Sequence, residues 1–259
     1  MACEIHPTAI IEDKVQLGEN VKIGAYVNIK SNVEIGDNTK IEPNAYIGSY
    51  TKIGKNCKIF PSAVVGTIPQ DLKFKGEFSE LIIGDNTTIR EFCMINRGTK
   101  GGGGITKIGS NNLIMAYVHI AHDCILGDNI IIANAVQFAG HIIVEDNAVI
   151  GGMTAIHQFV RIGKFAMVGG MSGIAQDIAP FCLAAGSRAK LHGLNLVGLK
   201  RAGFPNEEIE HLKNAYKIIF KSKLRFEEAY EKLKNSPSKN VIHMIEFLKA
   251  SKRGFCRDR

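Results

Sequence analysis

The chain has 259 residues, of which 45% are hydrophobic, and a formal net charge of +7. This length suffices for one large domain with an appendage or for two domains. No apolar run approaches the ~20 residues needed to cross a bilayer, and no charged-then-apolar leader precedes the first repeat. We therefore expect a cytoplasmic protein without an integral membrane segment. The six cysteines form no Cys-x-x-Cys pair, which indicates free thiols in a reducing compartment.

Aliphatic side chains recur at every sixth position over residues 5–65, 83–95 and 108–174. This period is neither helical nor plain strand alternation. Hexapeptide repeats are typical of parallel β-helices, and three of them make a coil of about 18 residues. The residue four positions after each aliphatic one is small or β-branched, as at Ala45 and Cys57. One long and one compact inward side chain per hexad would fill a narrow triangular prism, so we predict a mostly β protein.

Two insertions interrupt the repeats, at about residues 66–82 and 96–107. Loops that project from a rigid scaffold are where functional residues gather. The repeats end near Pro180, and beyond Ser187 the apolar spacing becomes helical. We predict a β-helix domain over residues 1–187 and a C-terminal α-helical domain over 188–259.

The helical domain should contain three short amphipathic helices. We expect them after Pro205, over residues 226–233 and from after Ser238 to about Ser251. They would cover the open end of the prism and protect its last backbone edge from pairing with another chain. Lysine and arginine are dense in this part of the chain. The simplest explanation is a solvated helical face, and the functional alternative is a docking surface for an acidic or phosphate-bearing partner. Nucleic acid is not expected, because no stacking aromatic residues are interleaved with the charges.

Four histidines lie outside the inward-facing positions, which are the first and fifth of each hexad. We expect their imidazoles to point outward; they are His119, His122, His141 and His157. Coils of 18 residues place His122 and Gly140 at the same position of successive coils, about 4.8 Å apart. Asp123 and His141 share the next position. Several imidazoles on adjacent coils of one face indicate a functional site.

An imidazole beside an accessible backbone N–H is the minimum requirement for acyl transfer. His122 would take a proton from the nucleophile, and the N–H of Gly140 would stabilise the developing oxyanion. Asp123 directly follows the base and is a candidate orienting partner, although adjacent side chains on a strand tend to diverge. The sequence has no Gly-x-Ser-x-Gly motif and its cysteines fall mostly at inward positions. We therefore expect direct attack by the acceptor substrate rather than a covalent intermediate.

Five segments carry motifs specific enough to identify a family: residues 70–73, 120–124, 138–141, 151–159 and 198–201. They closely resemble the UDP-N-acetylglucosamine O-acyltransferases of lipid A biosynthesis, and the likeness extends over essentially the whole chain. The resemblance implies a homotrimer of left-handed β-helices, with active sites between subunits and neither cofactor nor metal. The implied reaction moves a 3-hydroxyacyl group from acyl carrier protein to the 3-position of the UDP-sugar.

The resemblance also implies roles for individual residues, with His122 as general base and the Gly140 N–H as oxyanion donor. Contacts to the sugar nucleotide would come from Gln70, Asp71, Lys73, His119 and His141. The nucleotide and phosphate region would be lined, partly from the neighbouring subunit, by His157, Gln158, Asn195 and Arg201. Gly170 matches a position that helps set acyl-chain length. The basic C-terminal region would attract the acidic acyl carrier protein.

Three residues depart from the family pattern: Asn96, Val197 and Ala202 stand where a histidine, a glutamate and a second arginine are common. These departures leave open whether the acceptor carries a 3-hydroxyl or a 3-amino group. Two other functions also stay open. One is a γ-class carbonic anhydrase with zinc on the imidazoles of His119, His122 and His141. The other is a non-enzymatic hexapeptide scaffold. An N-acyltransferase acting later in the same pathway is a closer rival, but such enzymes resemble this chain with an additional N-terminal nucleotide-binding domain.

Overall fold

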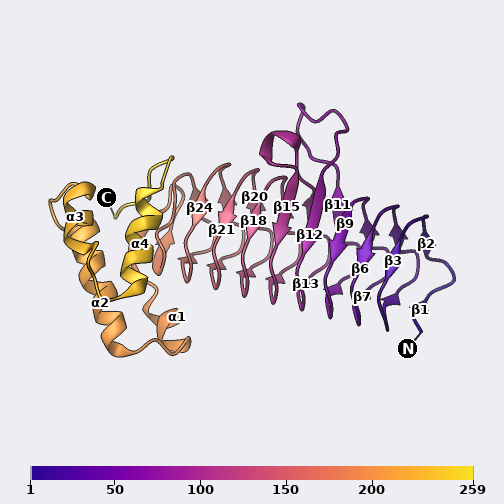
Figure 1. Cartoon of the computed structure of the whole chain (residues 1–259), viewed down its shortest axis with the longest axis horizontal. Helices are drawn as coiled ribbons and strands as arrows, with labels where there is room; N and C mark the ends of the chain where they lie inside the picture. Colours follow the sequence, from indigo (N-terminus) through magenta and orange to yellow (C-terminus); the bar gives the residue numbers. More distant parts are fainter. Residues whose placement is uncertain (1, 259) are drawn as a thin grey trace.

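The computed structural model describes residues 2–258, which form a long three-sided β-helix with helices at one end (Figure 1). Each turn of the chain contributes one short strand to each of three parallel sheets. The first sheet holds β1 (Glu4–Ile5), β4 (Lys22–Ile23), β7 (Lys40–Ile41), β10 (Lys58–Ile59), β13 (Thr88–Ile89), β16 (Leu113–Ile114), β19 (Ile131–Ile132), β22 (Val149–Ile150), β25 (Met167–Val168), β27 (Cys182–Ala185) and β28 (Lys190–Leu194). Its last pair, β27 and β28, is antiparallel.

The other two sheets complete the prism. The second sheet holds β2 (Ile10–Ile11), β5 (Asn28–Ile29), β8 (Tyr46–Ile47), β11 (Val64–Thr67), β14 (Met94–Asn96), β17 (His119–Ile120), β20 (Gln137–Phe138), β23 (Ala155–Ile156) and β26 (Gly173–Ile174). The third holds β3 (Gln16–Leu17), β6 (Glu34–Ile35), β9 (Thr51–Ile53), β12 (Glu80–Ile83), β15 (Ile105–Ile108), β18 (Ile125–Leu126), β21 (Ile143–Val144) and β24 (Arg161–Ile162).

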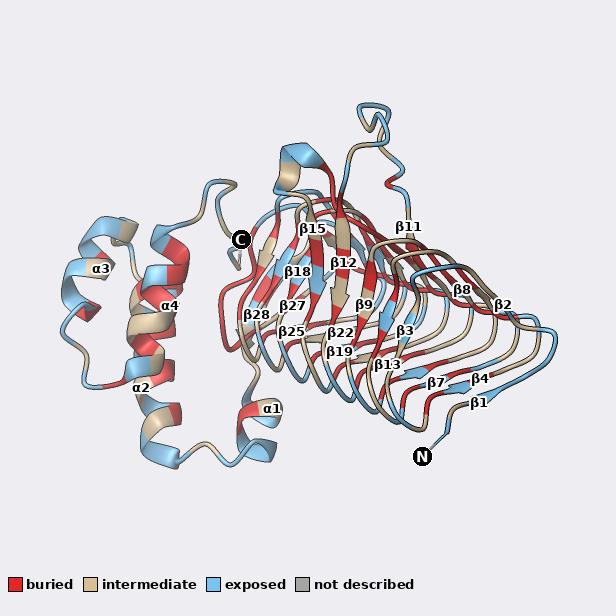
Figure 2. Ribbon diagram, turned by 45° about the vertical axis from the view of Figure 1, so that its right-hand side comes forward, coloured by how far each residue is buried: buried red, intermediate tan, exposed pale blue. Residues whose placement is uncertain are grey.

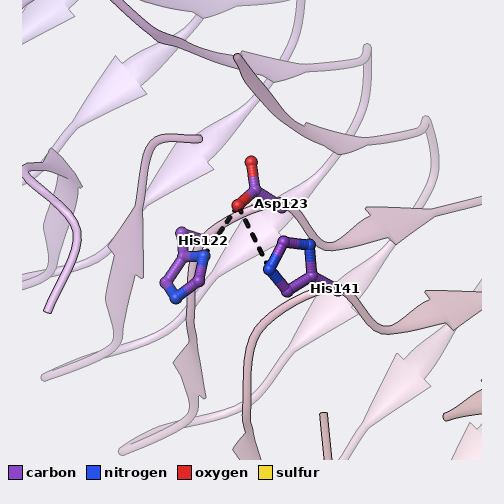
Figure 3. A group of neighbouring side chains, drawn as sticks. All are labelled: His122, Asp123 and His141. Atoms are coloured by element: carbon purple, nitrogen blue, oxygen red, sulfur yellow. Dashed lines mark hydrogen bonds and ion pairs between the residues drawn. The ribbon is translucent and has the colours of Figure 1, made fainter. Parts of the chain in front are cut away.

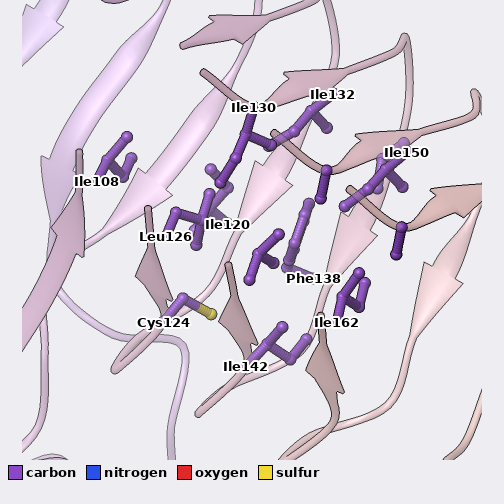
Figure 4. Packing of buried hydrophobic residues seen from close by; sticks show 14 of the residues in the cluster. Ile108, Ile120, Cys124, Leu126, Ile130, Ile132, Phe138, Ile142, Ile150 and Ile162 are labelled. Atoms are coloured by element: carbon purple, nitrogen blue, oxygen red, sulfur yellow. The ribbon is translucent and has the colours of Figure 1, made fainter. Parts of the chain in front are cut away.

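The register of the strands confirms the predicted coil. Ile120 pairs with Phe138, which in turn pairs with Ile156, so equivalent hexad positions stack along one face. From Val21 onward, the long aliphatic and the compact residues of the hexads fill the interior, and Figure 4 shows part of this packing. Cys57, Cys93 and Cys124 have no exposed surface, as predicted for the compact position. All six cysteines are free.

The corners between strands explain why asparagine and glycine recur in the hexads. A residue with positive φ occurs at most corners, for example Asn38 at 58° and Asn56 at 55°, a conformation that asparagine tolerates better than most residues. The glycines serve a different purpose, because the coils approach each other closely there. A Cβ atom on Gly36 would lie 2.7 Å from the backbone carbon of Gly54.

Three long edges run where the sheets meet, and Figure 2 shows the coils as three-sided outlines. The loop-bearing edge lies between the second and third sheets and includes Asp123 and His141. Both predicted insertions project from it: residues 68–79 join β11 to β12, and residues 97–104 join β14 to β15. The second insertion contains a 3-10 turn, η1 (Lys100–Gly102). The two loops therefore extend from the same edge as the residues predicted to be functional.

The helices follow the last strand and lie at one end of the prism (Figure 1). The three predicted helices are present as α2 (Asn206–Tyr216), which continues into the π-helical turn η2 (Lys217–Lys221), α3 (Phe226–Leu233) and α4 (Lys239–Lys249). A further helix, α1 (Leu196–Arg201), was not predicted, because six residues are too few for an amphipathic period. The domain division predicted at residue 187 falls in the turn between β27 and β28 and stays a prediction.

Side chains on α4 join the helices to the prism. His243 lies 2.8 Å from the Glu145 carboxylate. Arg161 donates a 3.0 Å hydrogen bond to the carbonyl of Phe247 and stacks 4.0 Å from its ring centroid. Among residues 2–258, no helix has the length and apolar character required to cross a membrane.

Candidate active site

The candidate site lies on the loop-bearing edge, where β17 turns into β18 and β20 turns into β21. The Nδ1 atom of His122 lies 2.7 Å from the Oδ2 atom of Asp123 (Figure 3). Adjacent side chains on a strand would point apart, but Asp123 occupies the corner and has a φ of 61°. This left-handed turn brings the two side chains together. The expectation from the sequence that the two side chains diverge was wrong, because it placed Asp123 on a strand.

Gly140 lies directly beside the imidazole of His122, one coil along. A Cβ atom on Gly140 would be 2.6 Å from Cε1 and 3.0 Å from Nε2 of His122. Only a glycine therefore lets the ring rest against this backbone. Gly140 is buried, and among residues 2–258 its N–H has no hydrogen-bond acceptor. The structure thus brings together the imidazole and the unpaired amide that the register places on neighbouring coils.

His141 completes the cluster. Its ring lies edge-on to His122, with centroids 5.2 Å apart, and its Nε2 atom lies 3.7 Å from Oδ2 of Asp123 (Figure 3). On its other side the ring stacks on Phe159 at 4.5 Å. Burial lowers the pKa of His141 and His122 lowers it further, while Asp123 opposes both. This imidazole is therefore neutral near pH 7 and offers one hydrogen-bond donor and one acceptor. Sequence reasoning missed Phe159, although it shares the hexad position of His141.

His119 is held by Asn96, one of the three departures from the family pattern. The Asn96 carboxamide oxygen lies 3.1 Å from Nε2 of His119, and its amide nitrogen donates to Thr67 and to the carbonyl of Ile68. Asn96 is fully buried, so it joins the histidine to the start of the first loop. Burial is the main cause that lowers the pKa of His119.

The two loops and the edge enclose a cavity of about 670 Å³, whose lining includes Asp71, Lys73, Phe74, Lys100, His141 and Phe159. Asp71 accepts a 2.9 Å hydrogen bond from the backbone of Lys73, which fixes the local turn. Gln70 is exposed and lies beside Met94. The loops are tied together by Arg97, whose guanidinium lies 5.4 Å from the ring of Tyr50 and 5.8 Å from that of Phe74.

A second hollow of about 530 Å³ follows the face of the second sheet beside the histidines. It is an open, mostly apolar groove lined by Phe138, Ala139, Ile156, Gly173 and Ile174, with His119 and His157 among its polar residues. Both His157 and Gln158 are exposed. Gly170 is exposed three residues before Gly173, at the border of this face.

Asn195 and Arg201 belong to a different edge of the prism. Asn195 caps α1 by accepting from the N–H of Gly198, and it donates a 3.0 Å hydrogen bond to the carbonyl of Phe165. Phe165 is the corner residue between the third and first sheets. Arg201 is the last residue of α1 and is exposed, as is Val197 near the start of the helix; Ala202 is the C-cap. One chain therefore does not bring Asn195 and Arg201 to His122.

The imidazoles do not form the three-histidine set that the carbonic anhydrase hypothesis requires. Within residues 2–258, the group whose potential ligand atoms all lie within 4.8 Å of one another is instead His122, Asp123 and His141. His119 bonds to Asn96. In the observed arrangement, Nδ1 of His122 is turned toward Asp123 as a hydrogen-bonding partner.

Comparisons with known proteins agree over the whole chain. A family profile described as UDP N-acetylglucosamine O-acyltransferase, domain 2, matches residues 177–256. The bacterial transferase hexapeptide profile matches residues 32–67 and 105–140. The acyl-[acyl-carrier-protein]–UDP-N-acetylglucosamine O-acyltransferase of Sulfurimonas denitrificans is 63% identical over 257 residues, which are 99% of this chain and 98% of that protein. The protein of the same name from Sulfurihydrogenibium is 58% identical over 97% of this chain and 93% of its own length.

Solved structures give the same result. The UDP-N-acetylglucosamine acyltransferase from Campylobacter jejuni has a TM-score of 0.95 and 47% identity, and the match covers 99% of this chain and 100% of that one. The enzyme from Francisella novicida has a TM-score of 0.96 at 36% identity, covering 98% and 94%. The fold is accordingly a left-handed parallel β-helix of hexapeptide repeats. The carbonic anhydrase and scaffold alternatives are not favoured by any of these matches, and the chain belongs to the UDP-N-acetylglucosamine O-acyltransferase family.

Proposed function

We propose that this acyltransferase moves a 3-hydroxyacyl group from acyl carrier protein to the 3-position of UDP-N-acetylglucosamine or its 3-amino analogue, with His122 as general base. This reaction is the first step of lipid A biosynthesis. The family membership supports the reaction type. The observation that supports the assignment of the base most directly is the contact between the His122 ring and the backbone of Gly140.

The proposed chemistry follows from the orientation of one imidazole. With Nδ1–H donating to Asp123, the Nε2 lone pair of His122 is free to take the proton from the attacking hydroxyl or amine. The acceptor oxygen or nitrogen then adds to the thioester carbonyl, and the N–H of Gly140 donates to the oxyanion that forms. Collapse breaks the carbon–sulfur bond, and the imidazolium returns its proton to the departing thiolate. The products are an ester or amide and a free carrier thiol.

Direct attack is supported by the state of the nearest thiol. Cys124 follows the catalytic pair but points into the prism, where its Sγ atom donates to the carbonyl of Ala139 at 3.2 Å. Burial raises the pKa of Cys124 to about 12. A buried thiol that stays protonated at neutral pH is a poor nucleophile. The proposal therefore includes no acyl-enzyme intermediate.

The two hollows beside the base suit the two substrates. We assign the polar cavity under the loops, which Asp71, Lys73 and His141 line, to the sugar nucleotide. Gln70 and His119 are further proposed contacts of this substrate. The apolar groove suits a fatty acyl chain, because burying its methylene groups is favourable at about 0.8 kcal/mol for each CH₂. Gly170 borders the groove face and leaves space for the chain end. His157 and Gln158 would contact the nucleotide and phosphate region.

A homotrimer would complete the site. Asn195 and Arg201 lie on another edge within one chain, and a neighbouring copy could bring its own α1 to the loop-bearing edge. The third edge, between the first and second sheets, carries a row of exposed apolar side chains: Phe92, Tyr117, Met153 and Met171. A second copy would cover them. Light scattering tests this, because a trimer has three times the 28.3 kDa mass of one chain.

The basic C-terminal helices would steer acyl carrier protein to the groove. We also propose a cytoplasmic location, where the six free cysteines would persist. Neither proposal changes the chemistry at His122.

A competition assay tests the proposed function. Purified protein is offered UDP-N-acetylglucosamine and its 3-amino analogue together, with 3-hydroxyacyl carrier proteins of several chain lengths. Formation of a sugar ester or amide, with release of one carrier thiol per product, supports the proposal and identifies the acceptor. The absence of acyl transfer to either sugar from every carrier would contradict it.

A further inference from the structure

The Asp123 carboxylate is held on two sides, and only one of them is the catalytic imidazole. Its side chain has no exposed surface. Besides the contact with His122, its Oδ1 atom accepts a 2.7 Å hydrogen bond from the backbone N–H of Thr99, and its Oδ2 atom accepts a 2.7 Å hydrogen bond from the Thr99 hydroxyl. Both oxygens are thus bound by one residue of the second loop, 24 positions earlier in the chain.

The loop is built to make this approach. Thr99 caps the 3-10 turn, because its Oγ1 atom accepts from the N–H of Gly102 at 3.2 Å while donating to Asp123. Gly102 packs against the same carboxylate: a Cβ atom there would lie 2.0 Å from Cγ of Asp123. Gly102 is not in the left-handed region, so the need for glycine comes from this contact alone. The backbone of Asp123 is fixed as well, since its N–H donates to the Thr106 hydroxyl at 2.8 Å.

We propose that Thr99 is a positioning residue for the acyl transfer, acting through the Asp123 carboxylate on the orientation of His122. The inference rests on the proposed role of His122 as the base. With Oδ1 and Oδ2 both bound to Thr99, the carboxylate cannot rotate about its Cβ–Cγ bond without losing two hydrogen bonds. Oδ2 therefore stays directed at Nδ1 of His122, which keeps the proton on Nδ1 and presents Nε2 to the acceptor.

The position of the loop gives this contact a second consequence. Thr99, Lys100 and Gly101 line the polar cavity that we assign to the sugar nucleotide. The loop of residues 97–104 would therefore contact the acceptor and, through Asp123, also hold the base. A ligand that orders residues 97–104 would also tighten the hydrogen bonds on Asp123. A glycine-rich segment here is explained by two requirements, the close approach of Gly102 and the left-handed conformation of Gly103 and Gly104 at 97° and 82°.

The test is a double-mutant cycle between Thr99 and Asp123. Thr99→Val keeps the shape and the backbone N–H but removes the hydroxyl. We expect kcat to fall about 10- to 100-fold, the range for losing one hydrogen bond to a charged group, with little change in KM for either substrate. Thr99→Ser retains the hydroxyl and should keep kcat within about threefold of wild type. In an Asp123→Asn background, Thr99→Val should cost nothing further, because the two residues act as one unit.

Thr39→Val is the matched control. Thr39 is fully buried, and its hydroxyl also makes two hydrogen bonds, donating to Gly54 at 2.8 Å and accepting from the N–H of Cys57 at 3.0 Å. It lies far along the prism from the site, so kcat should not change. Gly102→Ala is a second variant, whose added Cβ would lie against the Asp123 carboxylate while the Thr99 hydroxyl itself is kept. Its effect on kcat should also disappear in the Asp123→Asn background. This variant therefore tests the inference even if Thr99→Val destabilises the fold.

The outcomes separate this inference from the proposed function. If His122→Ala is inactive but Thr99→Val and Gly102→Ala keep full kcat, or lower it equally with and without Asp123, the positioning role of Thr99 is wrong and the base assignment stands. If His122→Ala keeps near-normal turnover, the base assignment fails, and the inference fails with it. A loss of kcat that Thr99→Ser restores and that disappears in the Asp123→Asn background supports the inference.

Discussion

The Nδ1 atom of His122 lies 2.7 Å from Oδ2 of its sequence neighbour Asp123. The contact depends on the prism corner, since Asp123 has a φ of 61° and its side chain turns back over the preceding residue. The same corner buries the Asp123 side chain completely. The proposed base and its proposed orienting carboxylate are thus two consecutive residues on one edge of the prism. The corner conformation is shared by His141 at 62°, which places its ring against the same carboxylate.

Asp123→Asn should lower kcat roughly 10²- to 10⁴-fold, up to the whole contribution of a general base, because an amide nitrogen facing Nδ1 favours the wrong tautomer. KM for both substrates should change little. Steady-state kinetics checks this. Asp146→Asn is the control, since Asp146 accepts a 2.8 Å hydrogen bond from the N–H of Asp128 on another edge. Equal kcat values for the two variants would show that Asp123 has no role in the mechanism.

Gly140→Ala should slow the enzyme without unfolding it. The added Cβ would lie 2.6 Å from the ring of His122, so the imidazole must move away from the backbone N–H. We expect kcat to fall roughly 10²-fold, the scale of losing one oxyanion donor, while the thermal unfolding midpoint stays close to wild type. A fully active Gly140→Ala enzyme would show that the ring and the amide need not be adjacent.

Lys73→Ala should weaken binding of the sugar nucleotide. Lys73 lines the polar cavity, and losing one charge-assisted contact raises KM for this substrate by about tenfold or more. KM for the acyl carrier protein should be unaffected. Lys58→Ala, an exposed lysine on the first sheet, is the control. An unchanged KM for the sugar nucleotide in Lys73→Ala would show that Lys73 does not bind this substrate.

Stability should decrease in mildly acidic solution, partly because of His119. Burial lowers the pKa of His119 in the folded protein below the ordinary value of about 6.5. As the pH falls through about 6.5, the unfolded chain takes up a proton that the folded chain resists, so folding becomes less favourable. The same sign applies to His141. Above about pH 7.5 this penalty is absent.

His119→Gln keeps an amide that can donate to Asn96 and removes the titration. Its unfolding midpoint should fall less than that of wild type between pH 7.5 and 5.5, as measured by thermal denaturation at both values. Because His141 still titrates, part of the decrease should remain. Identical decreases in the two proteins would contradict the assigned direction of the pKa shift.

Much of this arrangement could be predicted from the hexad period. The period fixes which residues point inward, so the burial of Cys57 and the stacking of Ile120 on Phe138 follow directly from it. It also places His122 beside Gly140, because equivalent positions lie one coil apart. These relationships depend only on a regular register, which the sequence repeats many times.

The contacts of the irregular segments could not be predicted in this way. Thr99 meets Asp123 across 24 residues, and no period relates an insertion to the coil that it covers. The short helix α1 is held by the Asn195 cap and its bond to Phe165 rather than by an amphipathic pattern. The proposed contribution of Asn195 and Arg201 to the site would require a second copy of the chain, and the register of one chain does not determine how two copies meet.

The most direct measurement compares the turnover of His122→Ala with that of wild type, using acyl carrier protein thioester and the sugar nucleotide at saturating concentrations. The proposed mechanism predicts that kcat falls roughly 10²- to 10⁴-fold, while circular dichroism and light scattering report the same fold and mass as wild type. Near-normal turnover by a correctly folded His122→Ala protein would contradict the mechanism.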